Sequence, residues 1–358
     1  MITNEIDTPL PLQNLEIKNF RAFRHLTIPR LGRVNLITGK NNVGKTAVLE
    51  AIRLFAERGS PKLLRDLLVR RSEVYDKVDA SNDSLLFSYM SLFNMDDSGF
   101  KPGTATIGPI GGSNTLSVNV TSEAQITLSF GETTRTSDLV TAFADSSLLK
   151  LETDITPCRF VKSHDFNRVL LKTTLADNFQ ETGLLGVKLH SIPPPLQNSA
   201  EKFLRLIEPR LDYLYYSSPD RIDRDFGGIT AQLKNNSEGI PLESMGEGMI
   251  RLFDVGLALP DLQNGILLID EIENGLHYSV MPSVWNKVFE VASELNMQVF
   301  ATTHSWDCIE AFQQVADGDH DPNSGLLIQL RNKSGNVVAT VHDEKDLAII
   351  TRNGIEVR

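Results

Sequence analysis

The sequence contains few of the residues and runs that mark several protein classes. Only two of its 358 residues are cysteines, and Cys158 and Cys308 lie far apart without a CxxC or Cys/His cluster, which excludes a disulfide framework or a zinc site. No window approaches the roughly 18 consecutive apolar residues of a membrane helix. Residues 1–16 also lack the basic and apolar regions of a signal peptide. We therefore expect a protein of the reducing cytoplasm with no membrane contact.

Basic residues are in the minority. The 35 Lys and Arg residues are outnumbered by 46 Asp and Glu residues, for a formal net charge of −11. This balance excludes a surface that is basic throughout and coats nucleic acid, so any DNA contact requires a local patch or a partner. Hydrophobic residues make up 41% of the chain, as in an ordinary soluble globular protein, and the length predicts about two structural units.

A phosphate-binding loop is the most specific motif in the chain. Residues 39–46 read GKNNVGKT and match G-x-x-x-x-G-K-[ST] without a mismatch. The apolar stretch 34–38 before it predicts a strand, and helical spacing after it predicts a helix that ends at Gly59. In this context the match is unlikely to arise by chance, because backbone N–H groups and the helix's positive end can surround a β-phosphate. The predicted nucleotide-binding residues are Gly39, Asn41, Asn42, Val43, Gly44, Lys45, Thr46 and Ala47.

Two further apolar stretches end in polar residues that complete such a site. Residues 265–271 (GILLIDE) describe a buried parallel strand that delivers Asp270 and Glu271 at its C-terminal end, where ligands bind in open α/β sheets. Lys45 is expected to reach the β- and γ-phosphates, Thr46 and Asp270 to hold Mg²⁺, and Glu271 to act as the general base toward water. Residues 299–305 (VFATTHS) place His304 as a sensor of the γ-phosphate. Taken singly, residues 265–271 could be an ordinary strand that ends in Asp-Glu, and His304 could be a capping or surface residue.

A fourth motif, residues 244–251 (SMGEGMIR), opens a predicted helix that runs to about Leu259. Serine and glycine at a helix N-terminus suit anion binding, although a plain N-cap is the ordinary explanation. The residues predicted to contact nucleotide here are Ser244, Gly246, Glu247 and Gly248.

The order of these motifs resembles the ABC-type ATPases of the OLD, RecF and SMC branch, and among them the OLD-like, AAA-annotated ATPases. The resemblance rests on LEIKNFRAF, GKNNVGKTAVLEAI, SMGEGMIRL, LLIDEIENGLH and ATTHS, and covers about residues 13–57 and 240–315. It implies that Ser244, Gly246 and Gly248 form the signature motif, residues 273–277 the D-loop, and His304 the switch histidine. It also implies a homodimer that traps Mg-ATP between the Walker motifs of one copy and the signature of the other.

The chain departs from the family pattern in two places. The best candidate for the Q-loop, residues 160–164 (FVKSH), contains no glutamine. No Toprim nuclease centre is visible after His304, and DGDHD at 317–321 reads as an acidic surface loop because it lies in a Pro-, Asn- and Gly-rich turn. A long heptad-bearing insertion typical of an SMC arm is also missing.

We therefore expect an α/β P-loop NTPase fold, an ABC-type ATPase head with an antiparallel β subdomain. Its expected parts are an N-terminal β region with the Walker A motif (1–57), a β-rich and helical insertion (58–157), a core strand with a helical subdomain (158–240), and a lobe carrying the signature, Walker B, D-loop and switch histidine (241–358). Finer expectations are two antiparallel strands over 15–28, a helix over 60–77, a β insert over 81–135, a mainly helical stretch over 166–214, and a final hairpin, helix and strand.

Three functions remain open at this stage. The first is an ATPase whose dimer state controls a separately encoded nuclease or toxin in anti-phage defence or DNA surveillance. The second is a RecF-like clamp that binds DNA directly, and the third is an ATP-bound scaffold that barely hydrolyses. A basic helix could offer the DNA contact, although a solvated helix face is the ordinary explanation for such a helix. Its basic residues are Lys62, Arg65, Arg70 and Arg71.

Overall fold

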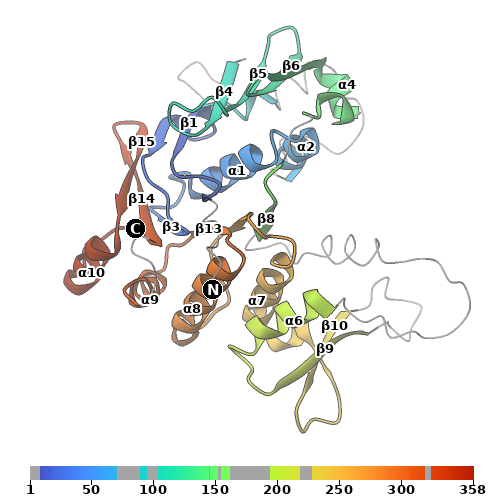
Figure 1. The fold of residues 1–358 in the computed structure, drawn as a ribbon, viewed down its shortest axis with the longest axis vertical. Helices are drawn as coiled ribbons and strands as arrows, with labels where there is room; N and C mark the ends of the chain where they lie inside the picture. The colour runs from blue at the N-terminus through green and yellow to red at the C-terminus, as the bar shows by residue number, and fades with distance from the viewer. Residues whose placement is uncertain are drawn as a thin grey trace, which may run out of the picture.

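The computed structural model describes residues 9–70, 89–94, 103–144, 146–151, 155–161, 194–217, 228–318 and 324–358. At its centre lies a six-stranded sheet in the order β15-β14-β3-β13-β12-β8 (Figure 1). Its strands are parallel except for β15, which pairs antiparallel with β14. Their bounds are β3 (Val34–Thr38), β8 (Cys158–Val161), β12 (Ile266–Ile269), β13 (Gln298–Thr302), β14 (Gly325–Lys333) and β15 (Asn336–His342).

A second, antiparallel sheet covers one face of this core. Its order is β2-β1-β4-β5-β6-β7, and it lies above helix α1 (Lys45–Ala56) in Figure 1. Its strands are β1 (Leu15–Phe20), β2 (Phe23–Ile28), β4 (Gly103–Gly108), β5 (Leu116–Val120), β6 (Gln125–Phe130) and β7 (Thr133–Asp138). Helices α2 (Pro61–Arg70) and α4 (Leu139–Ala144) lie at one end of this layer in Figure 1. The 3-10 turn η1 (Ser146–Leu149) packs against α4 and β7.

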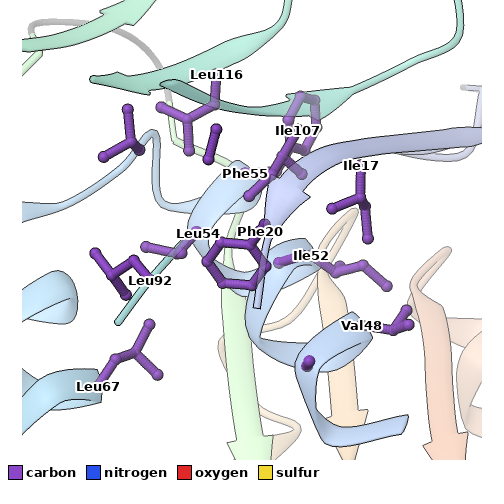
Figure 2. Packing of buried hydrophobic residues seen from close by; sticks show 14 of the residues in the cluster. Ile17, Phe20, Val48, Ile52, Leu54, Phe55, Leu67, Leu92, Ile107 and Leu116 are labelled. Atoms are coloured by element: carbon purple, nitrogen blue, oxygen red, sulfur yellow. The ribbon is translucent and has the colours of Figure 1, made fainter. Parts of the chain in front are cut away.

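Helix α1 is sandwiched between the two sheets because it is apolar on nearly all sides. Figure 2 shows Phe20, Ile52 and Phe55 packed together between strand and helix, and the Phe55 ring lies 5.7 Å from that of Phe130. The Walker A helix is therefore fixed along its length. Since α1 begins directly after the phosphate-binding loop, this packing also fixes the loop's far end.

The other face of the central sheet is covered by helices. Alternation along the strands sends Val34 and Leu36 to this second core and Ile37 to the first. In the second core Trp285 meets Phe312 edge to face, with ring centroids 4.9 Å apart. The covering helices are α6 (Pro194–Leu204), α7 (Glu247–Ala258), α8 (Met281–Glu294), α9 (Trp306–Ala316) and α10 (Glu344–Asn353), with short 3-10 turns at η2 (Leu242–Met245) and η3 (Tyr278–Val280).

Several expected elements are present and others are corrected. The hairpin over 15–28 forms β1 and β2, and the antiparallel β insert is present as β4–β7. Because β4 pairs with β1, the insert and the hairpin form one sheet. The helical stretch predicted to reach residue 214 is wrong at its end. Helix α6 stops at Leu204, and β9 (Leu211–Ser217) pairs with β10 (Gly228–Leu233) and β11 (Ile240–Pro241), since tyrosine-rich LDYLYYS suits a strand.

The C-terminal expectation is also partly wrong. The hairpin β14–β15 and helix α10 are present, but residues after Gly354 form no strand. Both edges of β14 are already occupied, by β3 and β15. The predicted helix over 60–77 is described only as α2, and residues 71–77 lie outside the described part of the chain. None of the helices in the described ranges has the length and apolar character needed to cross a membrane.

Candidate nucleotide-binding site

The predicted phosphate-binding loop connects β3 to α1. Its tight course uses positive φ angles at Gly39 (145°), Asn42 (63°) and Gly44 (107°). A Cβ on Gly44 would lie 2.7 Å from Cζ of Phe23, so only glycine lets the β1–β2 turn approach the loop. Helix α1 has no side-chain cap at Gly44, which leaves its first N–H groups available to an anion.

Lys45 is the buried cation of the site. Its Nζ donates hydrogen bonds to the main-chain oxygens of Gly39 (2.7 Å) and Lys40 (3.2 Å). Burial lowers the pKa of Lys45, and the negative charges of Glu271, Asp270 and Glu273 oppose this shift. The ammonium group is thus held by main-chain oxygens of the loop in which it is expected to bind phosphate.

Asp270 lies at the end of β12 beside the Walker A threonine. The Thr46 hydroxyl is 3.3 and 3.2 Å from the two carboxylate oxygens of Asp270, and the Thr302 hydroxyl donates to Oδ1 of Asp270 at 2.7 Å. Carboxylate and hydroxyl oxygens are hard ligands of the kind that Mg²⁺ prefers. The donor set therefore fits the predicted cation, with Thr46 and Asp270 as its ligands.

Glu271 follows in a left-handed conformation, with φ of 52°. Its N–H donates to the Thr302 hydroxyl at 2.8 Å, while Arg251 donates to the main-chain oxygens of Asp270 and, at 3.1 Å, of Glu271. Burial lowers the pKa of Arg251, while the negative charges of nearby carboxylates raise it, and Asp254 has the largest of these effects. The backbone of Glu271 is thus held on both sides.

The Glu271 carboxylate is also held at both oxygens. Asn274 Nδ2 donates to Oε2 at 2.9 Å, and His304 Nε2 lies 3.3 Å from Oε1. The N–H of His304 in turn donates to Oε1 of Glu273 at 3.0 Å. The predicted base and the predicted sensor therefore touch each other, and both are tied to residues of the predicted D-loop.

One cavity of about 630 Å³ brings most of these groups together. Its lining includes the Walker A loop, Asp270, Glu271 and His304, although Lys45 and Glu271 lie more than 200 residues apart in the chain. Gly39 and Val43 belong to the loop but do not line the cavity. The complete lining is Arg21, Ala22, Asn41, Asn42, Gly44, Lys45, Thr46, Ala47, Ser91, Phe93, Asp270, Glu271 and His304.

The four predicted signature residues do not line this cavity. Ser244 is exposed in η2, before the helix rather than at its cap, because α7 begins at Glu247. Gly246 has φ of 99° and faces open space. Gly248 lies against the D-loop, where a Cβ would come within 2.4 Å of the Gly275 oxygen.

Sequence reasoning missed residues that the fold brings to the site. Arg21, from the β1–β2 turn, lines the cavity, donates to the Ser91 oxygen at 3.1 Å, and lies 3.6 Å from Glu50 on α1. Its position between Phe20 and Phe23 in the predicted hairpin is the sequence signal that could have pointed to it. Thr302 and Asn274 were also missed, although both lie inside quoted motifs.

Other predicted sites are described only in part. Lys62 and Arg65 are exposed on α2, while the side chain of Arg70 and all of Arg71 lie outside the described residues. The Q-loop candidate is described only at Phe160 and Val161, and the acidic loop only to residue 318. Within the described ranges no group of three or more His, Cys, Asp or Glu residues is arranged to hold a metal ion.

Comparisons with known proteins show which families and relatives this chain resembles. A family model described as "AAA domain, putative AbiEii toxin, Type IV TA system" matches residues 34–307. An "ATP/GTP phosphatase" of Helicobacter pylori is 22% identical over 341 residues, which cover 85% of this chain and 88% of the relative. A shorter stretch of 72 residues is 35% identical to "DNA replication and repair protein RecF" of Heliobacterium modesticaldum and covers 20% of this chain and 19% of that protein.

The structure itself is similar to a solved Smc head domain derived from Pyrococcus furiosus, bound to the C-terminal domain of ScpA. The TM-score is 0.53 at 12% sequence identity, with 96% of this chain and 99% of the other covered. Together with the family match, this likeness confirms the predicted α/β P-loop NTPase fold with mixed sheets.

Proposed function

This chain belongs to the AAA-domain family matched above, and we propose that it binds and hydrolyses ATP as an ABC-type switch. The observation that carries the proposal is the single cavity in which the Walker A loop, Asp270, Glu271 and His304 converge. These groups come from the ends of strands β3, β12 and β13, at the sheet edge where α/β proteins bind ligands.

Each group has a distinct task in this reading. The free N–H groups of α1 and the Lys45 ammonium hold the β- and γ-phosphates, and Thr46 with Asp270 holds Mg²⁺, which neutralises phosphate charge when bound. Glu271 accepts a proton as the water oxygen attacks the γ-phosphorus and the bond to the β–γ bridging oxygen breaks, which yields ADP and phosphate. His304, 3.3 Å from Glu271, orients the base and the γ-phosphate.

A second copy of the chain completes the site. Ser244, Gly246 and Glu247 are exposed and lie apart from their own chain's cavity. This separation supports an arrangement in which the signature of one copy covers the nucleotide of the other. ATP then stabilises the dimer, and hydrolysis releases it.

The biological role follows the OLD-like resemblance. We place the dimer in control of a separately encoded effector, a nuclease or a toxin, in anti-phage defence or DNA surveillance. The toxin–antitoxin wording of the family description supports this role, and so does the net charge of −11, which favours a protein partner over direct DNA coating. We therefore propose both that the chain is an OLD-like ATPase and that it acts on such an effector.

Replacement of the base tests the enzymatic part. Glu271→Gln keeps the shape of the side chain and the contact with Asn274 but removes the base, so we expect kcat to fall about 10²- to 10⁴-fold while ATP still binds. Saturating Mg-ATP should then trap the variant at twice the mass of the nucleotide-free protein, measured by light scattering. Equal turnover in wild type and Glu271→Gln would leave only the scaffold function. A monomer at every ATP concentration would exclude the composite site.

The RecF-like stretch supports a second candidate, a clamp that binds DNA directly. The test compares wild type with a variant in which Lys62, Arg65, Arg70 and Arg71 become Gln, over a salt series. DNA affinity that falls steeply with salt, and whose salt dependence weakens in the variant, would establish this candidate. Weak binding in both proteins favours control of a partner protein.

A further inference from the structure

Thr302 is a hydrogen-bond partner of both the predicted cation ligand, Asp270, and the predicted base, Glu271. It is the last residue of β13 and is fully buried. The parallel register pairs Ile269 of β12 with Ala301 of β13. Asp270 and Thr302, the residues that follow this pair, are therefore neighbours. Both side chains lie on the α1 face of the sheet, as alternation along the strands requires.

Among the described residues, the acceptor found for the hydroxyl proton of Thr302 is Oδ1 of Asp270. The N–H of Glu271 can only donate, and it donates to the Thr302 oxygen at 2.8 Å. The hydroxyl must therefore give its own proton to Oδ1 of Asp270, at 2.7 Å. The same carboxylate faces the Walker A threonine, because the Thr46 hydroxyl lies 3.3 Å from Oδ1 and 3.2 Å from Oδ2.

The same hydroxyl supports the backbone of the base. Glu271 has a positive φ of 52°, a strained conformation for a non-glycine residue that persists only where its surroundings enforce it. Thr302 holds the N–H of this residue and Arg251 holds its carbonyl oxygen. The direction in which the Glu271 side chain leaves the backbone depends on these two contacts.

We propose that Thr302 is a positioning residue that orients the Asp270 carboxylate and the Glu271 base together through one hydroxyl. The inference rests on the proposed ATPase function. Thr302 does not line the cavity, so it acts through these two residues and not on the nucleotide. Because cation ligand and base share this support, its loss disturbs both at once.

Three matched variants test the role. Thr302→Val preserves shape and removes both hydrogen bonds, and Thr302→Ser restores the hydroxyl. Thr38→Val is the control, because Thr38 is another fully buried threonine at the end of the neighbouring strand β3, and its hydroxyl has no hydrogen-bond partner in the described structure. All three are measured for kcat, KM for ATP, the Mg²⁺ concentration that gives half-maximal rate, and Tm.

For Thr302→Val we expect kcat to fall about 10- to 100-fold and the half-saturating Mg²⁺ concentration to rise by a similar factor, as for other residues that support metal ligands. KM for ATP should change little, because the phosphate-binding loop is untouched. Thr302→Ser should recover most of both losses, and Thr38→Val should match wild type.

The inference is overturned if Thr302→Val lowers only Tm, or if its kcat and Mg²⁺ dependence equal those of Thr38→Val. It is also overturned if Thr302→Ser shows the same losses as Thr302→Val, since a hydroxyl would then not be what matters. Failure of the proposed function looks different, because wild type itself would not hydrolyse ATP.

Discussion

The contact between Gly248 and Gly275 offers a sharp test of how the signature helix bears on the base. Gly248 lies in the first turn of α7, and Gly275 belongs to the predicted D-loop, one residue after the Asn274 that holds Glu271. Replacing Gly248 by alanine places a Cβ 2.4 Å from the Gly275 oxygen. That atom belongs to the backbone, so the D-loop or the helix must move.

The size of the shift follows from the distances. Real Cβ contacts essentially never fall under 3.0 Å and are ordinary from 3.4 Å, so the two backbones must separate by about 0.6–1 Å. Overpacking of this kind costs about 1–3 kcal/mol, and the gain in helix propensity from glycine to alanine returns up to about 1 kcal/mol. A displacement near 1 Å at a catalytic group can lower the rate about 100-fold. We expect Gly248→Ala to lower kcat about 10- to 100-fold with a net loss of stability of about 0–2 kcal/mol.

Gly256→Ala is a closely matched control. Gly256 lies in the same helix, and its Cβ would meet Cα of Ala200 on α6 at the same 2.4 Å. Neither Gly256 nor Ala200 lines the cavity or contacts the D-loop glycine. Both variants are assayed for Tm and for steady-state turnover at saturating Mg-ATP. Gly256→Ala should lose stability like Gly248→Ala but keep wild-type kcat. The reasoning is refuted if the two variants share the same kcat, because the contact with the D-loop would then not control the base.

Three further outcomes are expected. Burial raises the pKa of Cys158 to about 12 and that of Cys308 well above its usual range, so Ellman's reagent at pH 8 should find no reactive thiol in the folded protein and two after denaturation. Burial lowers the pKa of Lys45 in the folded protein below its value in the unfolded chain. Between these two pKa values the unfolded state binds more protons, so the stability of the protein rises with pH. Lys45→Met should therefore raise Tm of the nucleotide-free protein at neutral pH, and this advantage should disappear at high pH, where Lys45 of the wild type is neutral. Gln298 exchanges three hydrogen bonds with Leu12 and Gly32, so Gln298→Leu should cost about 2–4 kcal/mol in urea unfolding.

The site residues that could be predicted from the sequence are those whose role follows from a single short segment of the chain. Each of the strands β3, β12 and β13 is an apolar run followed by a glycine-rich turn, a pair of carboxylates or a polar cluster. These patterns identify Lys45, Asp270, Glu271 and His304 together, because the C-terminal ends of parallel strands share one sheet edge. The cavity brings these four residues together. Local pattern and tertiary placement agree here, so the prediction needed no knowledge of contacts.

The missed residues depend on contacts between stretches. Thr302 matters because the β12–β13 register puts it beside Asp270, and no pattern within ATTHS reveals that register. Arg21 reaches the cavity only because the β1–β2 turn folds over the Walker A loop and excludes any side chain at Gly44. The strand β9 was missed for a related reason, since pairing with β10 and β11 decides what LDYLYYS becomes.

The geometry of Glu271 is therefore a property of the whole fold. Its N–H is held by β13, its carbonyl by the signature helix, and its carboxylate by the D-loop and by His304. A residue with φ of 52° keeps that conformation only while such contacts outweigh its cost. One of the four contacts, from Arg251, comes from the helix that also carries the exposed signature, and the D-loop that supplies another lies against Gly248 of the same helix. A displacement of that helix therefore cannot leave Glu271 unchanged. In the dimer that we propose, a second copy that engages the signature would therefore act on Glu271 through the contacts of Glu271's own chain.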